Sequence, residues 1–189
     1  MKPHLTETDF DEAANYLGCD VPALKAVAEV ESAGRGFCPD DFPKILFEGH
    51  VFYRFTCGAY AAAHPSLCYK GWTREHYGRT WQAERARFES AIALDRDAAL
   101  MSTSWGMFQI MGFNHGVCGC ATIQRFVNSM CQSEREQGRL FIEYIIHEGL
   151  VDELREHRWD DFARRYNGPL YFKNKYAERM AAAYARFAE

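Results

Sequence analysis

Two glutamates lie two positions apart in VAEVESAGRGF, residues 27–37, where a helical pattern runs into a glycine turn. Because each residue of an α-helix turns by about 100°, Glu31 falls within about 20° of the apolar stripe that includes Leu24, whereas Glu29 points about 140° away. Burial and the negative end of the helix dipole both disfavour a charged carboxylate, so we expect the pKa of Glu31 to be raised toward that of a general acid. The alternative is a structural carboxylate that binds an arginine or a backbone amide near the turn.

The elements that position these residues are expected to be mainly α-helical. Apolar residues recur with helical spacing between residues 10 and 17, where Thr6 or Thr8 is the expected N-cap and Gly18 the stop. A second helix is expected to begin after the N-cap Asp20, with a proline in its first turn, and to carry both glutamates. Further helical patterns cover residues 80–100, 121–149, 152–166 and 174–187.

The middle of the chain is less regular. Residues 43–55, PKILFEGHVFYRF, are rich in aromatic and β-forming residues, and residues 58–72 contain several breakers and are expected to form a loop. Residues 104–120, SWGMFQIMGFNHGVCGC, contain four glycines and are expected to hold a short helical segment between loops. Since no repeat, low-complexity tract or linker interrupts the sequence, we expect residues 1–189 to form a single domain.

The composition is that of an ordinary globular chain, with 48% apolar and 25% charged residues among 189 and a net charge of −4. This balance argues against nucleic acid as the main partner, because phosphate-binding surfaces carry a basic excess. Residues 155–175 differ, with six Lys or Arg against three acids, which indicates either a surface facing an anionic polymer or a solvated helix face. The sequence has no apolar run long enough to span a membrane and no recognisable export signal, so synthesis in the cytoplasm is expected.

The cysteines raise the question of a metal site. There are seven, at positions 19, 38, 57, 68, 118, 120 and 131. One set, formed by His115, Cys118, Cys120 and Cys131, could be interpreted as a zinc site, but its CxC spacing is not that of a standard zinc finger. We therefore expect free thiols, no metal and no cofactor, with disulfides formed after release to an oxidising compartment as the alternative.

Three segments together resemble the lysozyme-like superfamily, in particular goose-type lysozymes and soluble lytic transglycosylases. VESAGRGF, residues 30–37, is similar to the catalytic "ES" motif of that family and aligns the catalytic acid with Glu31. SWGMFQIM, residues 104–111, resembles the G-L-M-Q-I motif, and RRYNGP, residues 164–169, resembles Y-N-x-G-P with one residue fewer. Over nearly its full length the chain resembles, more narrowly, the N-acetylmuramidase domain of phage endolysins and related bacterial lysins.

This resemblance implies a mainly α, lysozyme-like helical domain with a small irregular or β-containing segment near the active-site cleft. It implies that Glu31 is the general acid and that Ser32, Gly106, Met107, Gln109, Tyr166 and Asn167 bind the substrate. The Gln109 amide suits sugar hydroxyls or N-acetyl groups, and Gly106 permits close approach of the backbone; the alternative is a tight turn with a satisfied polar side chain.

Aromatic residues have similar alternatives. The Tyr166 hydroxyl either contacts the substrate, orients Glu31 or is satisfied within the core. Trp72, Tyr77 and Trp105 are candidates for flat faces on which sugar rings stack, or for core residues.

Glycosidases usually need a second carboxylate, and the sequence does not single one out. The candidates are Glu48, Asp97, Ser102, Thr103 and Ser104. Asp97 fits better as the N-cap of residues 98–101, and Glu48 as a structural partner of Arg54 or His50. Without a second acid, the substrate's N-acetyl group could assist while its 6-hydroxyl attacks, as in lytic transglycosylases; alternatively, a hydroxyl of residues 102–104 could position a water.

We expect a muramidase that acts, as a monomer, on the β-1,4 bond between N-acetylmuramic acid and N-acetylglucosamine in the glycan strands of peptidoglycan. The expected role is that of a phage-type endolysin that reaches the cell wall after holin-mediated release, and the alternative is a toxin delivered by a secretion system. A lytic transglycosylase with anhydro products and a catalytically silent wall-binding module are the remaining hypotheses.

Overall fold

The computed structural model describes residues 2–168 and 171–189, without the side chains of Ser32 and Tyr171. This part of the chain contains ten α-helices: α1 (Glu7–Leu17), α2 (Val21–Ser32), α3 (Gly49–Phe55), α4 (Trp81–Leu94), α5 (Arg96–Met101), α6 (Ile123–Gln132), α7 (Glu134–His147), α8 (Val151–Arg155), α9 (Trp159–Asn167) and α10 (Tyr176–Phe187). It also contains the strands β1 (Ile45–Phe47), β2 (Thr103–Trp105) and β3 (Ile110–Met111), and the 3₁₀ helices η1 (Gly112–Asn114) and η2 (Tyr171–Asn174). The mainly α class expected from the sequence is confirmed.

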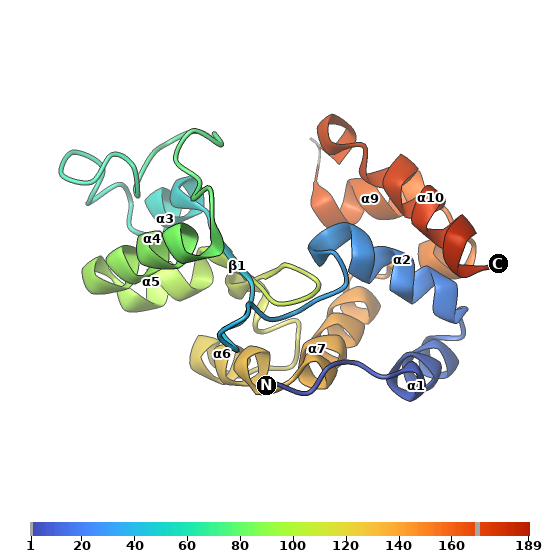
Figure 1. Ribbon diagram of the computed structural model, residues 1–189. Coiled ribbons are helices and arrows are strands. Elements are labelled where there is room, and N and C mark those ends of the chain that lie inside the picture. The colour runs from blue at the N-terminus through green and yellow to red at the C-terminus, as the bar shows by residue number, and fades with distance from the viewer. Residues whose placement is uncertain (1, 169–170) are drawn as a thin grey trace.

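The helices lie on both sides of the small sheet. In Figure 1, α3, α4 and α5 lie on one side of β1, and α1, α2, α9 and α10 on the other, with α6 and α7 along the lower edge of the view. α2 packs along α10, which also contacts α9, and α4 packs against α5 and β1. The C-terminal end of α2, which carries Glu31, therefore points from the C-terminal helices toward the sheet.

Part of the sheet occupies the start of residues 104–120, the segment in which a short helix between loops was expected. Its strands pair antiparallel in the order β1-β2-β3, with Ile45 opposite Trp105 and Trp105 opposite Ile110. Gly106 (φ 73°) and Gln109 (φ 49°) adopt left-handed backbone conformations between β2 and β3. Because a right-handed helix cannot continue through such residues, the chain turns back there as a hairpin, and the short helical segment expected within residues 104–120 is the 3₁₀ helix η1 that follows it.

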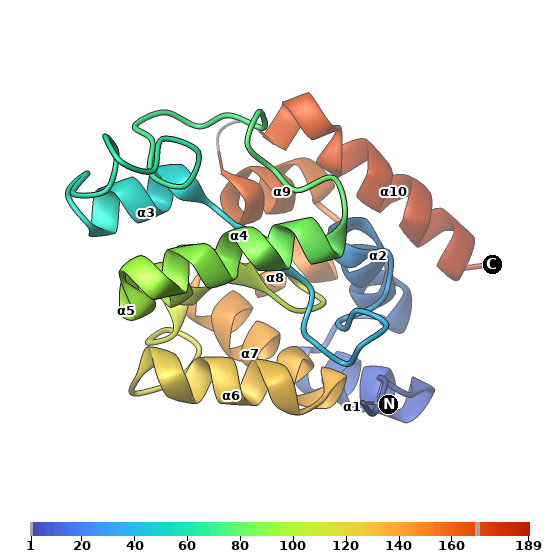
Figure 2. The same ribbon diagram turned by 60° about the vertical axis from the view of Figure 1, so that its left-hand side comes forward.

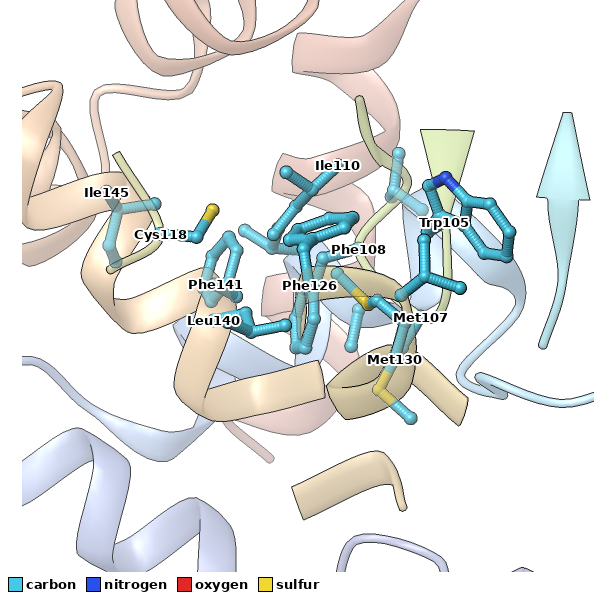
Figure 3. Close-up of a cluster of buried hydrophobic side chains, with 14 of the residues drawn as sticks. Trp105, Met107, Phe108, Ile110, Cys118, Phe126, Met130, Leu140, Phe141 and Ile145 are labelled. Carbon is cyan, nitrogen blue, oxygen red and sulfur yellow. The ribbon is translucent and has the colours of Figure 1, made fainter. Parts of the chain in front are cut away.

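The hairpin is anchored in the main hydrophobic core. Figure 3 shows Trp105, Met107, Phe108 and Ile110 gathered with side chains of α6 and α7, and the Phe108 ring stacks on Phe141 with centroids 4.1 Å apart. Trp105 and Met107 are each only 1% exposed. This burial confirms the alternative that Trp105 is a core residue, and it corrects one expectation, because the Met107 side chain is not open to a glycan.

Helix caps confirm most of the boundaries expected at the N-terminus. Thr6 caps α1 through a capping box, Gly18 ends it in a left-handed conformation, and Asp20 caps α2 by accepting a hydrogen bond from Ala23. Asp97 was expected to cap α5, but Asp95 does so by accepting a hydrogen bond from the amide of Ala98.

A long connection separates α3 from α4. Figure 2 shows it arching from α3 over α4 toward the segment that precedes α10. Of the helices in the described part of the chain, none combines the length and apolarity needed to cross a membrane.

Candidate active site

Glu31 lies in the last turn of α2, where the helix gives way to the left-handed C-cap Ala33 (φ 55°). Its carboxyl accepts a 2.9 Å hydrogen bond from the side-chain amide of Asn167, at the end of α9. Burial raises the pKa of Glu31 from its ordinary value of about 4.5 to about 7, and the Asn167 hydrogen bond and the Arg179 charge offset only part of that effect. Near neutral pH this carboxyl is therefore protonated in a substantial fraction of molecules, as a general acid must be.

Glu29 has the opposite environment, as the helical angle predicted. Its side chain is 37% exposed and forms an ion pair with Arg186 on α10. The two glutamates therefore differ because one turn of α2 places Glu29 toward solvent and Glu31 against protein.

Two residues of α10 that the sequence did not single out complete the surroundings of Glu31. Arg179 donates a 3.0 Å hydrogen bond to the carbonyl of Val30, at the end of α2. Burial, followed by the charge of Glu31, raises the pKa of the Tyr176 hydroxyl, which shows that the phenol lies within electrostatic range of the acid. Tyr176 and Arg179 are three positions apart on one helix and therefore share a face, and this spacing was the signal in the sequence that could have identified them.

Glu31 lines a cleft of about 530 Å³. Gln109, residues between 35 and 46, and the first turns of α4 at Trp81 and Arg85 line it. Glu31 is the only Asp or Glu among the described residues in that lining. A ligand in this cleft thus meets one acid, apolar loop residues and several basic side chains.

The hairpin presents Gln109 to the cleft in a fixed orientation. Its Nε2 donates to the carbonyl of Gly106 at 2.8 Å, and its Oε1 accepts from the Ser104 hydroxyl at 2.9 Å. The left-handed backbone of Gln109 costs roughly 1 kcal/mol or more for a residue other than glycine, and such strain is often found at functional sites. The Ser104 hydroxyl is thereby assigned to orienting Gln109.

Gly106 lies at a turn where two constraints favour a glycine. A Cβ there would lie 2.7 Å from the side chain of Gln137 on α7, and the left-handed backbone (φ 73°) matches the tight turn that was the alternative, so the turn and the internal packing both require a glycine. Gln137 is completely buried, accepts a hydrogen bond from the amide of Met107 at 2.8 Å and donates one to the carbonyl of Met130 at 2.8 Å. It therefore connects the hairpin to α6 and α7.

Two buried polar residues at the start of α7 also hold the loop that follows Glu31. The amide of Gly36 donates to Glu134 at 2.7 Å, and a Cβ on Gly36 would lie 2.0 Å from the Gln137 side chain. Glu134 further accepts from the amide of Leu5 at 2.9 Å. The sequence analysis missed these residues; a signal was available, because 134 and 137 share the buried face that continues to Leu140 and Phe141.

Tyr166 connects α9 to the hairpin and to α7. Its hydroxyl donates a 2.6 Å hydrogen bond to the carbonyl of Phe108, and its ring packs edge-on against Phe141. Burial raises the pKa of this hydroxyl well above the ordinary value. Tyr166 thus ties α9, which carries Asn167, to the hairpin that carries Gln109, and its hydroxyl is satisfied within the protein.

Glu48 lies outside the lining of the cleft. The Tyr77 hydroxyl lies 2.8 Å from both of its carboxylate oxygens, and His50 Nδ1 lies 3.3 Å away. Arg54, the other expected partner, instead lies over the rings of Phe55 and Phe113. The structural pairing with His50 is therefore observed, and Tyr77 is committed to Glu48 rather than presented as a flat face.

The other candidates for a second catalytic group are placed unfavourably for that role. Asp97 is on the surface beside Arg96, and Ser102 and Thr103 are completely buried. The Thr103 hydroxyl donates to the carbonyl of Ala99 at 2.8 Å. Ser32 ends α2, and its side chain lies outside the described part of the structure.

The cysteine and histidine residues do not converge. The seven cysteines are free, and His115 Nδ1 lies 2.9 Å from the carbonyl of Cys120. Within residues 2–168 and 171–189, no group of three or more His, Cys, Asp or Glu side chains is close enough to hold a metal ion, so the zinc hypothesis lacks a ligand set there.

The basic segment 155–175 separates into two parts. Its four arginines make internal bonds: Arg155 to the carbonyl of Leu17, and Arg158, Arg164 and Arg165 to acids of α8 and α9. They match the interpretation as a solvated helix face. Lys173 differs, because it lies on η2, 6.0 Å from the centroid of the Trp72 ring.

A mainly α domain defines the lysozyme-like class when its cleft lies between a small antiparallel sheet and a helix that ends in a partly buried glutamate, as it does here. The chain belongs to the N-acetylmuramidase family, glycoside hydrolases that degrade peptidoglycan, because the family model described as N-acetylmuramidase matches residues 20–188. The crystal structure of the Burkholderia AP3 phage endolysin is similar, with 40% sequence identity and a TM-score of 0.85; the match covers 98% of this chain and 71% of that one. Among curated proteins, none matches this chain.

Proposed function

We propose that this chain cleaves the β-1,4 bond between N-acetylmuramic acid and N-acetylglucosamine, with Glu31 as the general acid. The observation that carries the proposal is the position of Glu31 in the lining of the cleft, where Asn167 bonds its carboxyl and burial raises its pKa to about 7. Family membership and the similarity to a phage endolysin support the same substrate.

The first chemical step is proton transfer from Glu31 to the glycosidic oxygen. The C–O bond to that oxygen breaks as the proton arrives, and positive charge develops at the anomeric carbon. Glu31 then becomes an anion, which the Asn167 amide and the Arg179 charge stabilise. These two residues lower the pKa of Glu31 and so favour release of the proton, while burial keeps that pKa high enough for the proton to be present before the reaction.

The remaining family positions are proposed to seat the glycan. Gln109, held by Ser104 and Gly106, presents its amide to the cleft for a hydroxyl or N-acetyl group. Tyr166 acts by positioning Asn167 and the hairpin, and Ser32 retains the substrate-binding role that the motif implies. Basic side chains of the lining, including Arg35, suit a polymer that carries carboxylates.

The second step is favoured to proceed without a second protein carboxylate, because Glu31 is the only acid in the described lining of the cleft. The substrate's 2-acetamido oxygen would then attack the anomeric carbon, and Glu31, now a base, would activate the nucleophile that displaces it. A water as nucleophile gives hydrolysis, which is our preferred outcome. The substrate's own 6-hydroxyl gives a 1,6-anhydro product, the outcome of a lytic transglycosylase, and the single acid makes this the second candidate.

The preferred biological role is that of an endolysin that reaches peptidoglycan after holin-mediated release, with delivery as an antibacterial effector as the alternative. Either role uses the same glycan cleavage. A silent wall-binding module would instead bind peptidoglycan without releasing fragments.

Mass spectrometry of fragments released from purified peptidoglycan tests the proposal, with Glu31→Gln as the inactive counterpart. Fragments ending in a reducing N-acetylmuramic acid would support hydrolysis, and fragments one water lighter would support the transglycosylase. No fragments from the parent, or equal release by Glu31→Gln, would refute the assignment of Glu31.

A further inference from the structure

Two segments that are far apart in the sequence meet at one exposed tryptophan, Trp72. The connection between α3 and α4 carries Trp72 and Arg74, and η2, just before α10, carries Lys173 and Asn174. Arg74 donates a 2.7 Å hydrogen bond to the side chain of Asn174, 100 positions away in sequence. Figure 2 shows the arch of this connection reaching toward the start of α10.

Two positive charges converge on the Trp72 ring. The Arg74 guanidinium carbon lies 5.7 Å from the ring centroid and the Lys173 ammonium nitrogen 6.0 Å from it. Within the described residues, no carboxylate lies within ion-pair distance of either cation, whereas Arg85, Arg87 and most arginines of α8 and α9 have acidic partners. Like charges that converge without a counterion favour an anionic ligand.

The cluster is connected to Glu31 through α9: η2, which carries Lys173, contacts α9, and Asn167 at the end of α9 donates a hydrogen bond to Glu31. Both the Glu31 charge, which raises the pKa of Tyr176, and the Arg74 charge, which lowers it, act on the same phenol, after burial as the largest cause. Tyr176 therefore lies within electrostatic range of both. The 530 Å³ cleft does not include Trp72, Arg74 or Lys173 in its lining, so this is a separate surface.

We propose that Arg74 and Lys173, with the Trp72 indole between the two segments, bind a carboxylate of the peptide stem attached to the glycan. The inference rests on the proposed function, because it assigns a part of that substrate to a surface that the glycan motifs do not reach. Trp72 is 43% exposed and supplies an apolar face for the stem or the adjoining sugar, while the two cations select its charge. Peptidoglycan is then recognised by its peptide as well as by its sugars.

Binding to the Glu31→Gln protein tests this without turnover. The probes are soluble glycan fragments with intact stems and the same fragments after their carboxyl groups have been converted to amides. In the Glu31→Gln background, Arg74→Gln together with Lys173→Gln should weaken binding of the anionic fragments roughly tenfold, as expected for two exposed ion pairs, and leave binding of the amidated fragments unchanged. Isothermal titration calorimetry measures both.

Two matched variants separate charge recognition from other effects. Arg125→Gln removes one positive charge from the exposed side of α6, half of the charge removed by the double variant, and Asn174→Ala removes the bond between the two segments while keeping both cations. Both should bind the anionic fragments like the unsubstituted background. An equal loss for both kinds of fragment, an equal loss in Arg125→Gln, or a loss in Asn174→Ala as large as in the double variant would overturn the proposal.

Fragment release and fragment binding, measured together, distinguish this inference from the proposed function. If the parent released no fragments but the carboxylate-dependent binding were observed, the anion site would stand and the catalytic assignment would fail. If fragments were released but binding ignored the stem carboxylates, the catalytic assignment would stand and the anion site would fail.

Discussion

Glu31 and Glu134 are both carboxyl groups that the fold removes from water, but their surroundings differ. Glu134, at the start of α7, accepts hydrogen bonds from the amides of Gly36 and Leu5 and lies 3.2 Å from His4 Nδ1. Glu31, at the end of α2, accepts one hydrogen bond, from Asn167, in the described structure. Glu134 thus has several hydrogen-bond donors and a helix N-terminus around it, whereas Glu31 has one donor and a helix C-terminus, so burial is the largest effect on the pKa of Glu31. Burial alone therefore does not identify a catalytic acid. The number of hydrogen-bond donors around the buried carboxyl distinguishes the two glutamates.

The largest effect is expected from Glu31→Gln. Loss of the proton donor should reduce peptidoglycan cleavage by about 10³-fold, within the range for general acid catalysis. Turbidity clearance and fragment release measure this loss. Glu29→Gln, which changes the exposed glutamate of the same helix, is the matched control and should remain close to the parent. Comparable losses in the two variants would contradict the assignment.

Glu31→Gln should also change the dependence of stability on pH. The pKa of Glu31 is about 7 in the folded protein and near the ordinary 4.5 when unfolded, so this group's stabilisation is complete below pH 4.5 and is lost as pH rises through 7. Removing the group should raise the free energy of unfolding at neutral pH by up to about 3 kcal/mol relative to the parent. Urea unfolding at pH 5 and pH 8 measures this free energy. A variant less stable than the parent at pH 8 would contradict the raised pKa of Glu31 and its contrast with Glu134.

Glu134→Gln should have the opposite effect on stability. The oxygen of the neutral amide accepts less strongly from one of the Gly36 and Leu5 amides, and the NH₂ group would face the N–H of the other, so we expect a loss of about 2–4 kcal/mol in the free energy of unfolding. The measurement is urea unfolding at pH 7 beside Glu136→Gln, a partly exposed acid on the same helix. An unchanged midpoint would show that the hydrogen bonds of Glu134 to Gly36 and Leu5 do not stabilise the fold.

A smaller effect is expected from Glu48→Gln. Its contacts with Tyr77 and His50 make it a structural partner, so we expect a loss of about 1–2 kcal/mol in the free energy of unfolding. Cleavage of soluble glycan fragments should fall less than about tenfold, because the proton donor is retained. Tyr77→Phe should have a similar stability loss. If Glu48→Gln instead lost activity as completely as Glu31→Gln while remaining folded, Glu48 would be the second catalytic carboxylate.

The parts of this site that depend on local sequence could be predicted. Helical spacing placed Glu31 against protein and Glu29 toward solvent, and Thr6 and Asp20 identified the starts of two helices. These features are set by residues within one or two turns of each other, so the sequence pattern contains them directly.

The parts that depend on distant contacts could not be predicted. Gly106 is small because of Gln137, 31 positions away, and the hairpin that contains it pairs with β1, about 60 positions earlier in the chain. The glycines of SWGMFQIMG could not distinguish a turn between strands from a helix end. The contacts of Arg179 and Asn167 with α2 likewise join segments more than 130 residues apart.

The smallest effect, and the one that refines the comparison most, is expected from Asn167→Ala. Its amide donates to the carboxylate form of Glu31 and so lowers the pKa that burial raises. Without that donor the pKa of Glu31 should rise above about 7, because the anion loses its one hydrogen bond while the desolvation remains. The decline of cleavage rate at alkaline pH should therefore move to higher pH, even where the maximal rate is reduced.

Arg179→Gln should move this decline in the same direction, since it removes the other group that favours the anion. The measurement is the pH profile of kcat on soluble fragments, and a limb that stayed in place or moved to lower pH in both variants would mean that a group other than Glu31 controls it.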